Sequence, residues 1–177
     1  MRAALVRSFI ALVALPGVGI AQNGQPVTPR SELMAHFDMS MRKVVALAQA
    51  MPESAYRWKP EPAAMEVGQV FAHIANYNFG YLSGNMGVML PAGIKRDTLE
   101  AMRNKAQVVA LLTRSMEYVK QSVAAMPAEQ LEKQTQLYGR TVPQWAVLMQ
   151  LVAHMNEHLG QSIAYARANK IVPPWSG

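Results

Sequence analysis

The sequence predicts an all-α protein, a four-helix bundle with long crossover connections. Four long segments carry apolar side chains at the spacing of an amphipathic helix. Two of the connections between these segments are long and contain proline and glycine, as in bundles with crossovers. The 177 residues, of which 51% are hydrophobic, are enough for one hydrophobic core.

The first residues have the features of a secretory signal peptide. Arg2 and Arg7 precede an apolar run at Phe9–Leu15, and small residues around Ala21 offer a cleavage site. The alternative is a membrane anchor, but the run falls short of the roughly 20 residues that a span needs. We therefore expect residues 1–21 to be removed near Ala21 and the protein to be exported, to the periplasm or beyond the cell.

The rest of the chain divides into a leader and one domain. Residues 22–30 are polar and contain proline and glycine, which predicts a flexible leader, and 31–177 form the domain. Cysteine is absent, so thiolate ligands and cysteine nucleophiles are excluded. Removing Arg2 and Arg7 leaves 15 basic residues against 11 acidic ones, and this mild, scattered excess does not predict nucleic-acid binding.

The first helix is predicted to begin at Ser31, a good N-cap, and to end before Pro52. Its apolar residues recur at positions i, i+3, i+4 and i+7. Residues 53–64 then hold Tyr56 and Trp58 together with two prolines, Pro60 and Pro62. We expect this segment to be an ordered loop whose aromatic rings pack on the core.

The second helix is predicted at Met65–Met86, followed by a long connection rich in glycine. That connection is expected to hold a short helix near Thr98–Met102. The third helix begins at Asn104 or Lys105 and is closed by Pro127.

Residues 127–140 are predicted to form a polar turn region, and the sequence favours few strands anywhere. Thr141 is the expected N-cap of the fourth helix, with Gln144 completing a capping box and Pro143 tolerated in the first turn. This helix is expected to end near Asn169, before two consecutive prolines.

Two histidines of the fourth helix have the spacing of metal ligands. His154 and His158 are four residues apart, so their imidazoles lie about 5–6 Å apart on one helical face. Two imidazole nitrogens placed in this way can share one divalent ion. At about 100° per residue, Gln161 and Tyr165 belong to the same polar stripe, at the edge of an apolar one.

His73 of the second helix is the candidate third ligand. Its face also carries Gly80 and Gly84, and glycine inside a helix costs about 0.8–1.0 kcal/mol relative to alanine. These glycines suggest that space is wanted beside the imidazole, for a small pocket or a close helix crossing. The alternative is a lone core histidine bonded to a backbone or hydroxyl group. His36, at the margin of the first helix's apolar stripe, is expected to be a surface or boundary residue.

Three parts of the chain carry a family resemblance. The segments are Tyr56–Pro60, Gly68–Ala75, and His154–Gln161 with the following Tyr165–Pro174. Together they span nearly the whole mature chain, and they resemble the DinB-like superfamily, which includes the YfiT-type proteins proposed to be hydrolases. The resemblance implies a four-helix bundle with long crossovers and a divalent metal held by one histidine of helix two and two of helix four.

The ligand positions implied by the resemblance are His73, His154 and His158. Relatives include thiol-dependent S-transferases and isomerases, and many have no assigned substrate. The sequence departs from a common pattern of the family at Leu159, where arginine often stands, and at Glu157, often a further histidine. These departures weaken the transfer of a specific activity but leave the metal site.

Three neutral imidazoles would leave an open position on the metal, where a water with a pKa lowered toward 7 is a nucleophile. Zinc is the first expectation and nickel the next, because imidazole suits both. Tyr77, Glu157 and Gln161 are candidates for orienting ligands or substrate, with simple packing or surface hydrogen bonds as the alternative. The catalytic residues are not identified.

Two classes of function follow. The first is a metal-dependent enzyme, with hydrolysis slightly favoured over thiol S-transfer because small thiols are expected to be scarce outside the cell. The second is a non-enzymatic bundle that binds metal, a ligand or a partner protein. We expect an unidentified small-molecule substrate, no nucleic acid and no membrane partner after signal cleavage, and a homodimer is compatible with the sequence.

Overall fold

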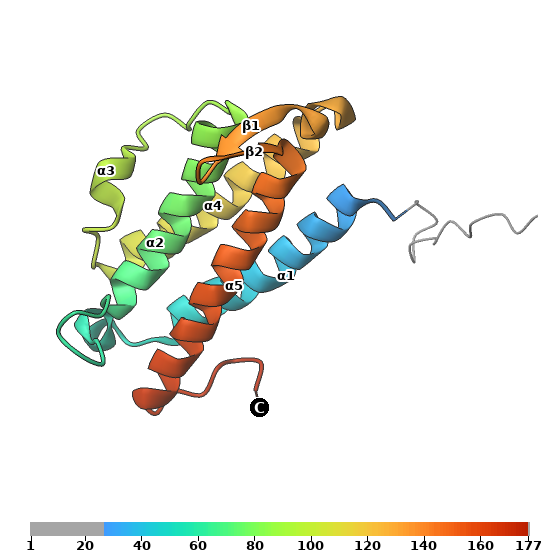
Figure 1. The fold of residues 1–177 in the computed structure, drawn as a ribbon. Coiled ribbons are helices and arrows are strands. Elements are labelled where there is room, and N and C mark those ends of the chain that lie inside the picture. The colour runs from blue at the N-terminus through green and yellow to red at the C-terminus, as the bar shows by residue number, and fades with distance from the viewer. Residues whose placement is uncertain (1–26, 177) are drawn as a thin grey trace, which may run out of the picture.

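The computed structural model describes residues 27–176. Four long helices form a bundle (Figure 1): α1 (Pro29–Ala50), α2 (Val67–Gly80), α4 (Lys105–Ala125) and α5 (Gln144–Ala168). Helices α1 and α2 each pack against both α4 and α5, so α1 lies diagonally opposite α2. The connections from α1 to α2 and from α4 to α5 therefore cross the bundle. This confirms the predicted all-α bundle with crossover connections.

Helix α1 begins earlier than predicted. Thr28 is its N-cap and Pro29 occupies the first helical position. The Thr28 hydroxyl accepts from the Ser31 backbone N–H, and the Ser31 hydroxyl accepts from the Thr28 N–H, which forms a capping box. The prediction that Ser31 is the N-cap is therefore wrong: Thr28 is the N-cap, and Ser31 is its partner at the third helical position. The helix ends at Ala50 because Pro52 cannot continue it.

The connection after α1 is an ordered 3₁₀ turn, η1 (Glu53–Arg57), that packs its aromatic residues inward. The buried Tyr56 hydroxyl donates to the Ala48 carbonyl at 2.7 Å. Proline at position 52 has no N–H, so the tyrosine replaces the helical donor that this carbonyl lacks. The Trp58 ring meets the Tyr165 ring edge-on, with centroids 5.4 Å apart. The expected inward packing of this segment is confirmed.

The second predicted helix is divided into two types of helix. Helix α2 begins at Val67 because Glu66 is extended, and it continues at Gly80 into a π-helical turn, η2 (Tyr81–Asn85). The Ser83 hydroxyl donates to the Phe79 carbonyl at 2.8 Å and so competes with the α-helical backbone bond. The prediction of one uninterrupted helix at Met65–Met86 is corrected accordingly.

The long connection that follows contains α3 (Arg96–Leu99), which packs against α2 and starts two residues before the predicted Thr98–Met102. Asn104 then caps α4 by accepting from the Gln107 N–H at 3.1 Å, and the helix begins at Lys105, one of the two predicted starts. Helix α4 ends at Ala125, before Pro127.

The predicted start of the last helix is wrong. A 3₁₀ turn, η3 (Ala128–Glu132), leads into an antiparallel hairpin of β1 (Gln134–Leu137) and β2 (Arg140–Pro143). Thr141 is paired with Gln136 in this hairpin, and its hydroxyl accepts from the Gln136 amide at 2.8 Å. Thr141 is thus a strand residue rather than an N-cap, and α5 starts at Gln144 with Pro143 as its N-cap.

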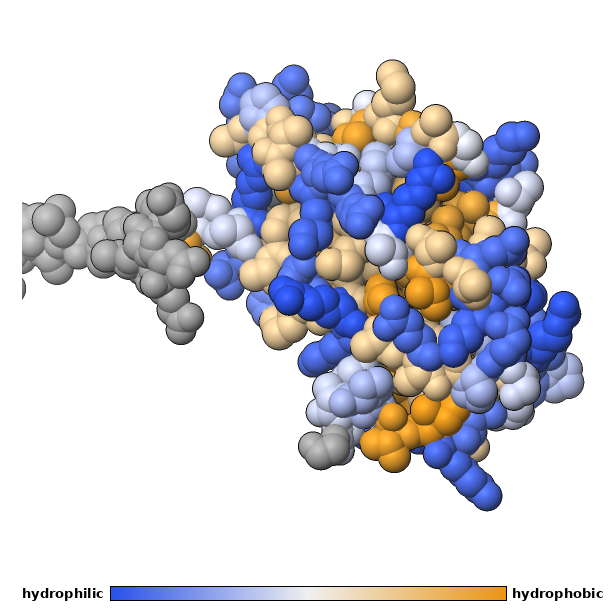
Figure 2. Space-filling view, turned by 180° about the vertical axis from the view of Figure 1, so that it is seen from behind, coloured by the Kyte–Doolittle hydropathy of each residue, from blue (hydrophilic) through white to orange (hydrophobic). Residues whose placement is uncertain are grey.

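The core fills the space between the four long helices with buried aliphatic, aromatic and methionine side chains. Figure 2 shows that hydrophilic side chains cover much of one outer face, with hydrophobic patches between them. None of the helices in the described part of the chain is long and apolar enough to cross a membrane. The predicted signal peptide, 1–21, and cleavage near Ala21 lie outside the described residues.

Candidate metal centre

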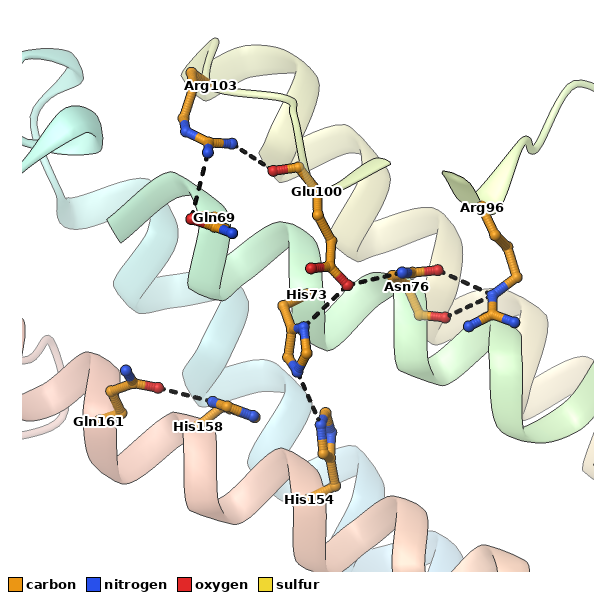
Figure 3. A network of polar contacts seen from close by, with 9 residues as sticks. All are labelled: Gln69, His73, Asn76, Arg96, Glu100, Arg103, His154, His158 and Gln161. Atoms are coloured by element: carbon orange, nitrogen blue, oxygen red, sulfur yellow. Dashed lines mark hydrogen bonds and ion pairs between the residues drawn. The ribbon is translucent and has the colours of Figure 1, made fainter. Parts of the chain in front are cut away.

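The structure brings three histidines together between α2 and α5. His73 comes from α2, and His154 and His158 come from successive turns of α5. One side-chain nitrogen from each imidazole can be chosen so that all three lie within 4.8 Å of one another. Figure 3 shows the three rings pointing into the same space. His154 and His158 are buried, with 9% and 8% of their surface exposed, and His73 is half-buried.

The spacing of these nitrogens fits a shared ion. The Nε2 atoms of His73 and His154 are 3.2 Å apart. Two ligands at zinc–nitrogen distances in a tetrahedral site would be about 3.3–3.4 Å apart. The donor set, three imidazoles without a thiolate, suits zinc, nickel, copper or iron. The residues present therefore fit a divalent transition metal.

Two of the rings are oriented by hydrogen bonds from their other nitrogen. His73 Nδ1 lies 2.9 Å from a Glu100 carboxylate oxygen, which can only accept, so Nδ1 carries the proton. His158 Nδ1 lies 2.8 Å from the Gln161 side-chain oxygen, whose amide nitrogen donates to the Tyr165 hydroxyl. In both rings Nε2 is left with its lone pair free to bind a metal.

A chain of hydrogen bonds extends from His73 away from the three histidines (Figure 3). The Asn76 amide donates to the same Glu100 oxygen at 2.8 Å, and Arg96 Nε donates to the Asn76 side-chain oxygen at 2.9 Å. The Arg103 guanidinium donates to the Glu100 backbone carbonyl and so fixes the residue that carries the carboxylate. Residues of the α2–α4 connection thereby set the orientation of a ring on α2.

Aromatic rings cover the cluster on one side. The Tyr77 ring stacks on His154 with centroids 4.3 Å apart and lies 4.4 Å from the His73 ring. The Tyr81 ring meets His154 edge-on at 5.8 Å. These contacts restrict the imidazoles to few orientations and reduce their contact with solvent.

The surroundings favour neutral imidazoles. Burial, followed by the nearby His158 and His73, lowers the pKa of His154 to about 3. Burial also lowers the pKa of His73 below its ordinary value, although the Glu100 carboxylate opposes this shift. Neutral imidazole is the form that binds a metal, so burial favours the binding form of His73 and His154.

A sequence profile of the DinB superfamily matches residues 36–162, which is most of the chain and includes all three histidines. The chain belongs to the DinB superfamily. Solved structures agree with this assignment at the level of the fold. A DinB-like protein from Bacillus cereus superposes with a TM-score of 0.70 at 15% identity, covering 81% of this chain and 95% of that one.

Two further structures show the same fold. A conserved protein from Enterococcus faecalis has a TM-score of 0.63 at 14% identity, over 80% of this chain and 96% of that one. YfiT from Bacillus subtilis, described as a probable metal-dependent hydrolase with an unusual four-helix bundle topology, has a TM-score of 0.62 at 13% identity, over 89% and 94%. The comparison with curated proteins found no match.

Of the three residues of this DinB protein predicted to orient ligands or substrate, two contact the imidazoles and one does not. Gln161 is bonded to His158, and Tyr77 covers two of the imidazoles. Glu157 is exposed and forms no hydrogen bond to the three rings within the described part of the chain. Leu159 is buried with 6% exposed, as a core residue. His36 is exposed on α1, which agrees with its expected surface role.

The two glycines on the His73 face make room, but not beside the imidazole. A Cβ atom at Gly80 would lie 2.3 Å from an Arg96 guanidinium nitrogen, so that group occupies the space. A Cβ at Gly84 would meet no atom within 4 Å. Both glycines line one hollow, together with Tyr77. The hollow is not lined by His73, so the space predicted beside the imidazole lies instead on the far side of Tyr77.

Sequence reasoning missed Glu100 and Arg96. Both lie in the connection between α2 and α4, where no periodic pattern relates a residue to a helix face. Only the packing of α3 against α2 brings them to His73 and Gly80. A lone acidic residue in a glycine-rich connection gave no signal of its role.

Proposed function

We propose that this DinB protein is a metal-dependent enzyme that holds a divalent ion through His73, His154 and His158. The observation that carries the proposal is the convergence of three imidazole nitrogens within 4.8 Å in the bundle interior. Zinc is our first choice of metal and nickel the second, because the donors are three neutral nitrogens.

The surroundings of the three imidazoles support metal binding over a purely structural cluster. Glu100 and Gln161 accept from the Nδ1 atoms and so direct the opposite nitrogens toward one point. Without a shared ion, one N–H could join His154 Nε2 to His73 Nε2, and the Nε2 lone pair of the buried His158 would face this pair without a donor. A metal bound by all three ring nitrogens would use these lone pairs.

We infer hydrolysis as the reaction class. A divalent ion held by three histidines would supply Lewis acidity and a water acidified toward neutral pH. The chain's own residues would fix the three ligands, limit the site on one side through Tyr77, and admit substrate from the hollow beyond it. The description of YfiT as a probable metal-dependent hydrolase points the same way.

Export is a further part of the proposal. The predicted signal peptide would place the protein in the periplasm or outside the cell, where small-thiol substrates are expected to be scarce. Hydrolysis of a small molecule is therefore preferred to thiol transfer. Fractionation of cells that express the full chain, with mass spectrometry of the mature N-terminus, tests this part.

The enzymatic proposal is tested with a panel of chromogenic esters and amides. We expect turnover that is lost after treatment with a chelator, restored by stoichiometric zinc or nickel, and absent in His158→Ala. His36→Ala, which removes an exposed histidine on α1, is the matched control and should retain turnover. Hydrolysis that survives in chelated protein or in His158→Ala would contradict the proposal.

A further inference from the structure

A polar hollow of about 220 Å³ lies next to the three histidines. The residues that line it include Tyr77, Tyr81, Tyr138, Asn85 and Arg96, together with the two glycines Gly80 and Gly84. Tyr77 and Tyr81 belong to the hollow and also contact the His154 ring, at centroid distances of 4.3 and 5.8 Å. The hollow is therefore one aromatic ring away from the histidine cluster.

Arg96 gives the hollow its charge. Its Nε donates to the Asn76 backbone and side-chain oxygens, at 3.3 and 2.9 Å, which fixes the plane of the guanidinium. Its two terminal nitrogens form no hydrogen bond or ion pair with any residue in 27–176. No aspartate or glutamate lines the hollow within this range. The hollow thus contains a fixed, half-buried cation that forms no direct ion pair within residues 27–176.

The backbone around the hollow is unusual at two places. The π-helical turn Tyr81–Asn85 forms one wall, and π turns are rare and frequent at functional sites. Opposite it, Tyr138 has φ 49° and Gly139 has φ 75° in the two-residue hairpin turn. Left-handed backbone costs a non-glycine residue roughly 1–2 kcal/mol. Here it places the Tyr138 hydroxyl 2.7 Å from that of Tyr81, and both residues line the hollow.

We propose that this hollow binds a carboxylate at one end of the substrate, held by the terminal nitrogens of Arg96 and the Tyr81 and Tyr138 hydroxyls. The inference rests on the proposed function, because the reacting end would extend past Tyr77 to the three histidines. A guanidinium matches a carboxylate with two parallel N–H donors. Tyr81 and Tyr138 use one hydroxyl proton for the hydrogen bond between them, and the other hydroxyl proton remains to be donated to a ligand.

Charge and size both favour a carboxylate on part of a larger molecule. The hollow offers one cation, which a monoanion balances, whereas a phosphate dianion would bring excess negative charge. Whole ligand pockets have volumes of about 300–1,000 Å³, so 220 Å³ is the size of one end of a ligand. The substrate class is therefore a small carboxylic acid whose ester or amide bond lies beyond the carboxylate.

Benzoate is a suitable probe for the hollow, with benzamide as its uncharged match. Their dissociation constants are measured by ligand-observed NMR titration of the full mature protein, and the metal content of every sample is determined. We expect wild type to bind benzoate in preference to benzamide. Arg96→Gln should weaken benzoate binding roughly tenfold or more, because it removes a charge-assisted pair of hydrogen bonds.

A second variant removes the site without removing the charge. In Gly80→Ala the new methyl group would lie 2.3 Å from an Arg96 terminal nitrogen and displace the guanidinium, so benzoate binding should also weaken. Gly160→Ala is the matched control, because its methyl group meets no atom within 4 Å. It should bind benzoate like wild type.

The outcomes separate this inference from the proposed function. Benzoate binding that is equal in wild type, Arg96→Gln and Gly80→Ala would overturn the carboxylate site, as would binding lost in His73→Ala but retained in Arg96→Gln. Inorganic phosphate that binds more tightly than benzoate in an Arg96-dependent way would overturn the choice of a carboxylate. Arg96-dependent benzoate binding in a protein that takes up no zinc or nickel and hydrolyses none of the test substrates would support the hollow although the proposed metal enzyme failed.

Discussion

At the scale of single residues, the candidate centre depends on which nitrogen of each imidazole carries the proton. Glu100 and Gln161 decide this for His73 and His158 by accepting from Nδ1. The helical spacing of His154 and His158 could be read from the sequence because it depends only on the geometry of one helix. The role of Glu100 could not be predicted from the sequence, because its contact with His73 depends on how an irregular connection packs.

Removing the Glu100 carboxylate should weaken metal binding without removing a ligand. In Glu100→Ala the His73 ring loses the acceptor that fixes its orientation, and we expect a 10- to 100-fold lower metal affinity, as is typical for such outer partners. Competition with a chromophoric chelator measures this. Glu157→Ala is the matched control, since Glu157 is exposed. Equal affinities in the two variants would show that Glu100 does not support the site.

The low pKa of His154 makes the stability of the metal-free protein depend on pH. Because the pKa is about 3 in the folded state and about 6.5 when unfolded, the unfolded state binds more protons between these values. The contribution of the neutral His154 ring to the free energy of unfolding is complete above the unfolded pKa. It is lost as the pH falls from there toward the folded pKa. The free energy of unfolding should drop by about 2 kcal/mol from pH 7 to pH 5 through this residue.

Urea denaturation of chelator-treated protein at the two pH values measures this drop. His154→Leu should reduce the pH dependence, because leucine does not titrate in this range. If the variant and the wild type lost the same free energy over this interval, another group would be responsible, and the assignment to His154 would be wrong.

At the scale of elements, helix ends were harder to predict than helix interiors. Apolar periodicity located α1, α2, α4 and α5, because burial of one face follows from local spacing. The hairpin was missed because each strand has only four residues, too few for a clear alternation, and because its turn uses Tyr138 in place of a usual turn residue. Thr141 consequently lies in β2 rather than at the predicted N-cap.

The end of α1 provides a test at this scale. Tyr56→Phe would leave the buried Ala48 carbonyl without a donor, because Pro52 cannot replace it. We expect a loss of about 1–3 kcal/mol in the free energy of unfolding, the cost of an unsatisfied buried polar group. Chemical denaturation gives the value. A variant as stable as wild type would mean that water or a shifted backbone satisfies this carbonyl.

At the scale of the whole molecule, the number of helices and the presence of crossovers could be predicted, but the arrangement of the helices could not. Periodicity describes one helix at a time and does not say which helices are neighbours. The structure places α2 beside α5, and this contact, distant in sequence, assembles the three histidines. A bound metal would therefore join two neighbouring helices, one from the first half of the chain and one from the second.

The central claim is that His73, His154 and His158 together bind one divalent metal ion, and its direct test is the metal content of the purified protein. Protein from unsupplemented medium should contain about one equivalent of zinc or nickel per chain by plasma mass spectrometry. His73→Ala and His158→Ala should each lose most of it, while His36→Ala, on an exposed face of α1, should retain it. Equal sub-stoichiometric metal in wild type and all three variants would contradict the claim.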